Sequence, residues 1–249
     1  MANTTTAIPK KQIEQLQNKC KTDLRFLCKY VCGMDIWEDT LHNRLVQHLE
    51  SPGPNKLILM PRGHLKSSIV TGAWAVQQLL RDPNTRILIT NAVWDRAREF
   101  LEQITSLLTH SSMLPQIFGS FEGPTSRFTR DEITIAQKSS VSKRGPSIRT
   151  AGLESSLTGS HCDIMVHDDL VEESNINTPE QIKKVIRFYT NSLDLLDPGG
   201  RIVVIGTRWA NPDLYGHIIA SEMTSLNGLP ISGEQRITWR EMLKRALNK

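Results

Sequence analysis

The sequence is short of the features that mark exported, membrane-bound or disulfide-rich proteins. It has only four cysteines, whose spacing fits neither paired CxxC motifs nor a small disulfide framework. No window approaches the ~18 apolar residues of a membrane span, and the N-terminus lacks the apolar run of a signal peptide. We therefore expect a soluble, intracellular protein. Its free thiols, which we expect in the core, are Cys20, Cys28, Cys32 and Cys162.

Aromatic side chains and net charge are also sparse. Phe, Trp and Tyr make up 6% of the residues and are scattered, so no platform for stacking nucleic-acid bases can be recognised. The formal net charge of +4 permits a polyanionic partner without requiring one. With 39% hydrophobic residues over 249 positions, the chain suits one sizeable α/β domain, with or without a small appendage.

Short apolar runs alternate with stretches of helical periodicity along the chain. We expect strands over 56–60, 86–90, 132–137, 147–151, 163–167 and 201–205. We expect helices over 11–31, 39–50, 67–80, 94–108 and 179–195, and a last helix from about Asp213. This alternation predicts an α/β fold with a mostly parallel sheet covered on both faces, and ligands beyond the carboxyl ends of the strands.

The loop after the first expected strand has the context of a phosphate-binding site, because it joins a strand to a helix N-terminus. Lys66 is placed to reach the β- and γ-phosphates of a nucleotide, and the Ser67 hydroxyl to ligate Mg²⁺. The strict pattern G-x-x-x-x-G-K-[ST] fails, because Met60 and Leu65 stand at its glycine positions and only Gly63 remains. An ordinary βα turn is therefore an equal alternative for this segment alone. The expected nucleotide contacts are Pro61, Arg62, Gly63, His64, Leu65, Lys66, Ser67 and Ser68.

Two adjacent carboxylates, Asp168 and Asp169, end a second apolar strand. Adjacent strand residues point to opposite sides, so the two can do different jobs in phosphoryl transfer. Asp168 can hold Mg²⁺, and Asp169 can orient or deprotonate the attacking water. Glu172 and Glu173 compete with Asp169 as the base. The alternative is that the two aspartates cap the next turn.

A third strand ends in Gly206, Thr207 and Arg208. Thr207 can sense a γ-phosphate or its water, and Arg208 can relay that state. The alternative is a plain strand terminus with Gly206 for close packing. Arg144 and Arg149, near the strand before the carboxylates, are candidates for an arginine that reaches the site of a neighbouring subunit; the alternative is a solvated surface role.

Together these segments resemble the ATPase domain of phage terminase large subunits. Residues 61–68 resemble the family's deviant Walker A motif, and 152–169 resemble its lead-in and Walker B strand. Residues 204–215 resemble its coupling motif and the step into the lid. The resemblance runs from about residue 36 to 220 and implies a P-loop NTPase of the ASCE, RecA-like type with a small helical C-terminal lid. We accordingly expect an arm and helix over 1–35, the ATPase core over 36–210, and a lid or linker over 211–249.

The resemblance further implies that the chain hydrolyses ATP with Mg²⁺ and drives double-stranded DNA into a procapsid, in the host cell cytoplasm. The implied partners are duplex DNA, the portal protein, the small terminase subunit and further copies of the chain in a ring, usually of five subunits; the isolated chain can be a monomer, and no membrane partner is expected. A helicase-like P-loop ATPase is the first alternative, although the sequence has no DExH-type box. A non-catalytic scaffold is the second.

Two departures from the family matter. Its usual catalytic glutamate is replaced by Asp169, so the base is either Asp169 or Glu172. In some members an arginine that acts across subunits stands at the place of Thr158, which leaves Arg144 and Arg149 as candidates here. Adenine contacts in the family lie before the first strand, where residues 37–42 match only loosely. The few acidic residues after Ala210 do not suffice for the family's nuclease domain, so we expect no nuclease activity from this chain.

Overall fold

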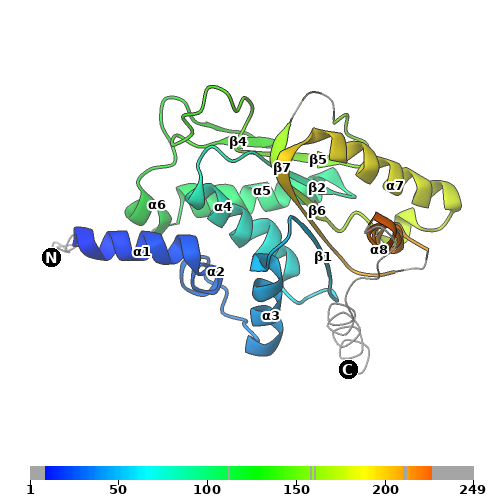
Figure 1. Ribbon diagram of the computed structural model, residues 1–249. Helices are drawn as coiled ribbons and strands as arrows, with labels where there is room; N and C mark the ends of the chain where they lie inside the picture. Colours follow the sequence, from blue (N-terminus) through cyan, green and yellow to red (C-terminus); the bar gives the residue numbers. More distant parts are fainter. Residues whose placement is uncertain (1–8, 112, 158, 160, 210–211, 226–249) are drawn as a thin grey trace.

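The computed structural model describes residues 9–111, 113–157, 159, 161–209 and 212–225. Within these residues, seven strands form one sheet in the order β1-β7-β6-β2-β5-β4-β3 (Figure 1). The parallel strands are β1 (Asn55–Leu59), β7 (Leu196–Gly206), β6 (Cys162–Asp168), β2 (Ile87–Asn91) and β5 (Ile148–Gly152). Two short antiparallel strands, β4 (Glu132–Thr134) and β3 (Arg127–Phe128), extend the sheet beyond β5. The expected fold class, a mostly parallel sheet flanked by helices, is confirmed.

The parallel strands are apolar on both sides because each lies between two helical layers. In β7, Val203 and Ile205 face a cluster shared with α3 (Asp39–Glu50), α4 (Ala75–Arg81) and α5 (Trp94–Thr109). Ile202 and Val204 face the other cluster, which α7 (Pro179–Ser192) and α8 (Leu214–Ser225) cover. Figure 1 shows these two layers on either side of the sheet. The alternation along each strand therefore decides which helices a side chain meets.

The single helix expected over 11–31 is wrong, because the chain breaks at Asp23. Residues 10–31 form α1 (Lys10–Thr22), a short α2 (Leu24–Phe26) and a π-helical segment η1 (Leu27–Val31). Asp23 has an extended backbone, and its carboxylate accepts the Phe26 amide at 2.8 Å. An aspartate is a favoured N-cap, so it ends one helix and starts the next. Side chains of this region still enter the main core, including Cys20, Leu24 and Leu27.

The helix after the phosphate loop runs from Lys66 to Arg81 and includes a π-helical segment, η2 (Ser68–Trp74), before α4. Such segments are rare and frequently lie at functional sites. Two short helices were not expected, α6 (Met113–Phe118) and η3 (Glu173–Asn175), whereas η4 (Leu193–Leu195) ends the helix expected over 179–195. A helix close to Asp213 was expected, and α8 begins at Leu214.

The cysteines are free, as expected, and all but half-buried Cys32 are buried. Burial raises the pKa of the Cys20 thiol to about 11 and that of Cys162 to about 12, which keeps both thiols protonated and unreactive. Among the described helices, none combines the length and apolarity that crossing a membrane requires. The expected N-terminal arm and most of the segment 211–249 lie outside the described residues.

Candidate functional site

The loop between β1 and the following helix, which the sequence predicts to bind phosphate, contains two residues with left-handed backbone. Gly63 has φ of 78° and Leu65 has φ of 54°, both in the left-handed region. Leu65 occupies the second glycine position of the strict motif, so the conformation is kept although the glycine is not. A non-glycine residue pays ~1–2 kcal/mol for this conformation. Left-handed turns of this kind form concave arrays of amide groups that bind anions.

The eight expected nucleotide contacts occupy three parts of this turn. Arg62, Gly63 and His64 are exposed at its tip, whereas Pro61 and Leu65 are half-buried. Lys66 is buried, with 5% of its surface exposed, and Ser67 and Ser68 begin the helix. The exposed residues at the tip are accessible to a ligand, whereas the Lys66 side chain is enclosed by the protein.

Lys66 is held by the second carboxylate of the strand end. Its Nζ donates to Asp169 Oδ2 at 3.1 Å, and both side chains are largely buried. Asp169 has φ of 45°, another left-handed residue that is not glycine. Such strained residues persist where the surrounding structure fixes them, and they cluster at functional sites. The sequence prediction that Lys66 and Asp169 meet at one edge of the sheet is consistent with this contact.

Asp168 is fully buried and is held by two hydroxyl groups. Ser67 Oγ donates to Oδ1 at 2.9 Å, and Thr71 Oγ1 donates to Oδ2 at 2.6 Å. Burial raises the pKa of Asp168 to about 7, and neighbouring Asp169 acts in the same direction, while these hydroxyl groups and Lys66 oppose the shift. No cation contacts this carboxylate among the described residues. The Asp168 carboxylate and the Ser67 hydroxyl are therefore the two oxygen groups that could hold a divalent cation at this site.

The two carboxylates contact different residues, and strand alternation alone does not set the direction of the second one. Strand β6 ends at Asp168, and the left-handed turn at Asp169 redirects the second side chain. As a result Asp168 meets Ser67 and Asp169 meets Lys66, two consecutive residues of one loop. The strand alternation instead separates Asp168 from His167, which contacts Ser192 of α7 on the other face at 3.2 Å.

The end of β7 ties this arrangement together. The Thr207 amide donates to Asp169 Oδ1 at 3.0 Å, and its hydroxyl donates to the Met60 carbonyl at 3.1 Å. The Met60 amide in turn donates to the Gly206 carbonyl at 3.0 Å. Thr207 therefore contacts both the entry of this loop and the second carboxylate.

Glu172 is not brought to Lys66 or Asp169. Its carboxylate is paired with Arg96 of α5, and it caps the short helix η3. Glu173 lies within that helix. These contacts give Glu172 a structural task, so Asp169 is the carboxylate that the fold presents to the phosphate loop.

Arg144 and Arg149 lie at the opposite end of the sheet. Arg149 is the second residue of β5, in register with Leu88 of β2, and Arg144 is exposed in the loop before that strand. Both line a cavity of about 330 Å³ at the amino ends of the strands. Within one chain they cannot reach the carboxyl ends, so only a second copy could bring them to a phosphate loop. Thr158 lies outside the described residues.

The segment 37–42 lies against the phosphate loop. His42 Nδ1 accepts the Glu38 amide at 2.8 Å, so Nε2 carries the proton and donates to the His64 carbonyl at 3.2 Å. The Trp37 ring lies 5.0 Å from the His42 ring. At the loop tip, the Arg62 guanidinium lies 4.7 Å from the Trp209 ring centre. Aromatic side chains from both sides therefore border the loop.

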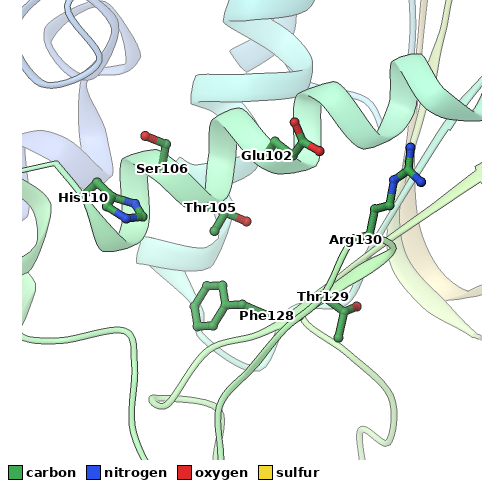
Figure 2. Close-up of a pocket in the computed structure, with 7 residues that line it drawn as sticks. All are labelled: Glu102, Thr105, Ser106, His110, Phe128, Thr129 and Arg130. Atoms are coloured by element: carbon green, nitrogen blue, oxygen red, sulfur yellow. The ribbon is translucent and has the colours of Figure 1, made fainter.

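A cavity of about 530 Å³ lies elsewhere, between the C-terminal half of α5 and the strand β3 with the turn that follows it. Figure 2 shows the side chains that line it: Glu102, Thr105, Ser106, His110, Phe128, Thr129 and Arg130. β3 is the edge strand opposite β1, so this cavity is remote from the phosphate loop. Its size alone does not make it the functional site, because Lys66, Asp168 and Asp169 come together elsewhere, at the carboxyl ends of the parallel strands.

Thr71 is the contact residue that sequence reasoning missed. It lies four positions after Ser67 on the same helix, and residues at this spacing share a face. That spacing was the available signal, and an apolar neighbourhood concealed it. The pairing of Glu172 with Arg96 joins residues of separate elements and left no local signal.

Comparison with known proteins agrees with the fold and the motifs. No protein-family model matches the chain. The chain is 30% identical over 166 residues to the terminase large subunit of Enterobacteria phage T3, a match that covers 64% of this chain and 27% of that protein. The crystal structure of the HK97 bacteriophage large terminase superposes with a TM-score of 0.56 at 13% identity, over 84% of this chain and 41% of that chain. The Phi-28 gp11 DNA packaging motor gives a TM-score of 0.48 at 14% identity, over 80% and 55%.

The two likenesses support different conclusions about this chain. The HK97 structure, at its low identity, shows a shared fold and nothing more. The T3 protein shares sequence as well, over a segment of its length. The resemblance of this chain to the large subunit of phage terminases, which the motifs around Lys66, Asp168 and Thr207 indicated, is confirmed.

Proposed function

We propose that this chain is the ATPase motor of a terminase large subunit, which hydrolyses ATP to move double-stranded DNA into a procapsid. The observation that carries the proposal is the convergence of Lys66, Asp168 and Asp169 on one left-handed loop beyond a parallel sheet. Three strand ends that carry lysine, carboxylate and threonine side chains are the parts that phosphoryl transfer requires.

The chain's own residues divide the work of hydrolysis. The amides of the phosphate loop and the Lys66 ammonium bind the phosphates of ATP. To do so Lys66 leaves Asp169, which frees the carboxylate to orient the attacking water and accept its proton. The Thr207 amide keeps that carboxylate in place through its bond to Oδ1. Glu172 remains the alternative base if its pair with Arg96 opens.

The donor set around Ser67 fits Mg²⁺. In nucleotide sites this ion takes one or two protein oxygens and completes its octahedron with phosphates and water. The described residues contain no group of three or more His, Cys, Asp or Glu side chains that could hold a metal on their own. Ser67 and Asp168 are therefore the protein ligands in this proposal. The ion would neutralise charge that develops on the phosphates.

The proposed partners follow from the same reading. We expect duplex DNA, a portal protein, a small terminase subunit and further copies of the chain in a ring. An arginine from a neighbouring copy would complete the site, and Arg144 and Arg149 are the candidates. Because the chain spans only 27% of its T3 relative, these partners and the packaging activity belong to the proposal.

Magnesium-dependent ATP hydrolysis by Lys66→Ala tests the site. We expect a loss of about 100-fold or more, which is ~2.7 kcal/mol of barrier, because Lys66 is the buried cation that the described residues place at the loop. The matched control is Lys184→Ala, whose lysine is exposed and paired with Glu154, and which should turn over like the wild type. If Lys66→Ala is as active as the wild type, the phosphate loop is misplaced and the motor proposal fails.

Nucleic-acid dependence separates the motor from the helicase-like alternative. Stimulation of turnover by duplex DNA supports the motor, and stimulation by single strands alone supports a helicase. ATP binding without turnover supports a scaffold. If the chain binds DNA through phosphates, log affinity should fall with log salt by about 0.9 per phosphate neutralised. A salt-insensitive complex contradicts this mode of binding.

Protein concentration tests the arginine from a neighbouring copy. Turnover per chain should rise with concentration, because the site is complete only where two chains meet. Arg144→Ala or Arg149→Ala should remove that rise while leaving the dilute rate unchanged. Strictly linear activity from dilute solution upward contradicts a role across subunits.

A further inference from the structure

One side chain outside the motifs lies against the site from the lid. Tyr215, on the first turn of α8, is fully buried. Its hydroxyl lies on Gly206 so closely that a Cβ at Gly206 would be 1.8 Å from the oxygen. Gly206 is therefore required by Tyr215, which gives a physical reason for the glycine that ends β7.

Gly206 occupies a special place in the contact between β7 and Asp169. The Asp169 amide donates to the Ile205 carbonyl at 2.9 Å, and the Thr207 amide donates to Asp169 Oδ1 at 3.0 Å. These two bonds enclose Gly206 in a ring that Asp169 closes. The Tyr215 hydroxyl thus rests on the one residue that both bonds enclose.

The hydroxyl hydrogen of Tyr215 has no acceptor among the described residues. A buried hydroxyl without a partner costs ~1–3 kcal/mol, so its retention calls for an explanation. The Val171 amide faces the phenol oxygen but is itself a donor. Burial, followed by the charge of Asp169, raises the pKa of Tyr215, so the group remains a donor.

The carboxylate of Asp169 has one hydrogen-bond donor on each oxygen in this structure. Asp169 Oδ1 accepts the Thr207 amide, and Oδ2 accepts Lys66. If Lys66 turns to the phosphates of ATP, Oδ2 loses its partner while the carboxylate keeps its charge. A donor is then required that leaves the carboxylate ionised and fixed in direction.

We infer that Tyr215 is a positioning residue of the hydrolytic site, whose hydroxyl takes over Asp169 when Lys66 moves to the nucleotide. This inference rests on the proposed ATPase function. The exchange of donors holds the base toward the water, and it draws α8 with it because Tyr215 belongs to that helix. The lid is thereby joined to the state of the nucleotide through one hydrogen bond.

Tyr215→Phe is the test, because it removes the hydroxyl and keeps the ring. Without nucleotide the hydroxyl hydrogen has no acceptor among the described residues, so we expect the melting temperature to change little. We expect kcat to drop about tenfold, with a smaller change in KM for ATP, since the bond that forms on ATP binding acts mainly by directing Asp169 toward the water. The matched control is Tyr30→Phe, the same change at a tyrosine that is 64% exposed.

Amide hydrogen exchange gives a second readout without turnover. A non-hydrolysable ATP analogue with Mg²⁺ should slow exchange in α8 of the wild type and of Tyr30→Phe, and not in Tyr215→Phe. If Tyr215→Phe keeps the wild-type kcat or the wild-type exchange response, this inference is overturned and the ATPase proposal stands. If the wild type neither binds nor hydrolyses ATP, the proposed function fails and takes the inference with it.

Discussion

The two ends of the sheet each carry a cluster of charges, and the clusters are built differently. At the amino ends, Arg86 donates to Asp163 through Nε at 3.2 Å and Nη2 at 3.1 Å, and it also pairs with Asp197. Lys143 and His161 add further contacts to these two carboxylates, at 3.2 Å each. At the carboxyl ends, fully buried Asp168 has only hydroxyl donors, and Lys66 has one carboxylate partner.

The difference separates structure from function. The amino-end cluster satisfies its central arginine several times over with groups of the protein, so nothing in it calls for a ligand. The carboxyl-end cluster is held by contacts that a phosphate and a cation could replace. Such groups, buried by the fold and incompletely compensated, are where functional sites are found. Substitutions made separately at the two ends of the sheet test whether this difference between a structural and a functional cluster holds.

The largest expected effect is at Asp168. Asp168→Asn should reduce ATP turnover by about 1,000-fold, or ~4 kcal/mol of barrier, because it removes the charged magnesium ligand. Because burial raises the pKa of Asp168 to about 7, the stability that its protonated form contributes is fully present below the unfolded pKa and is lost progressively as pH rises through about 7. At pH 8 the variant should therefore melt at the same or a higher temperature. Lower stability together with retained turnover contradicts this account.

Asp163→Asn is the counterpart at the amino ends and should show the reverse. It weakens the contacts of the buried Arg86 guanidinium, and bonds to charged groups contribute ~1.5–3 kcal/mol each. The melting temperature should fall by ~2–4 °C for each kcal/mol lost. ATP turnover below that temperature should stay close to the wild-type value. A specific loss of kcat in a folded variant would make the amino end part of the active site.

A smaller effect is expected at Thr71. Thr71→Val keeps the shape but removes the donor to Asp168, so the carboxylate loses one of its two orienting bonds. We expect turnover to fall about tenfold, with a higher magnesium concentration needed for half-maximal rate. The matched control is Thr105→Val, whose hydroxyl bonds only to the Leu101 carbonyl on its own helix. Equal magnesium requirements in the two variants refute a role for Thr71.

A different kind of effect, on acid stability and not on turnover, is expected at His167. Burial lowers the pKa of His167 to about 3, and its ring nitrogens contact Thr90 at 2.7 Å and Ser192 at 3.2 Å. Its contribution to stability is present above the unfolded pKa of 6.5 and is lost as pH falls toward 3. The loss reaches ~1.4 kcal/mol per pH unit at most. Urea denaturation between pH 6 and pH 4, about two pH units, should show that the free energy of unfolding depends less on pH in His167→Gln than in the wild type. Parallel curves for the two proteins contradict the assignment.

Much of the site followed from the sequence, because each reactive residue lies at the end of an apolar strand or in the segment that follows it. Parallel strands bring their carboxyl ends to one edge, so Lys66, Asp168 and Thr207 were expected to meet. The backbone conformation of Leu65 could not be read from the residue, since a leucine at that place argues against a left-handed turn. Only the surrounding contacts impose it.

Contacts between residues of different elements could not be predicted from the sequence, for a different reason. Tyr215 meets Gly206 through the return of α8 over β7, and Arg96 meets Glu172 across separate helices. No spacing in the sequence encodes either contact. The break at Asp23 was missed because apolar periodicity continues through it, although a capping residue was present. Tertiary packing thus decided what periodicity left open.

The most direct test of the account is ATP hydrolysis by Asp169→Asn beside Glu172→Gln, at high protein concentration with Mg²⁺. Asp169 touches Lys66, whereas Glu172 is paired with Arg96. We predict a loss of about 100-fold or more in Asp169→Asn and a rate within about threefold of the wild type in Glu172→Gln. Activity that survives Asp169→Asn and disappears in Glu172→Gln would contradict the assignment of Asp169 as the base.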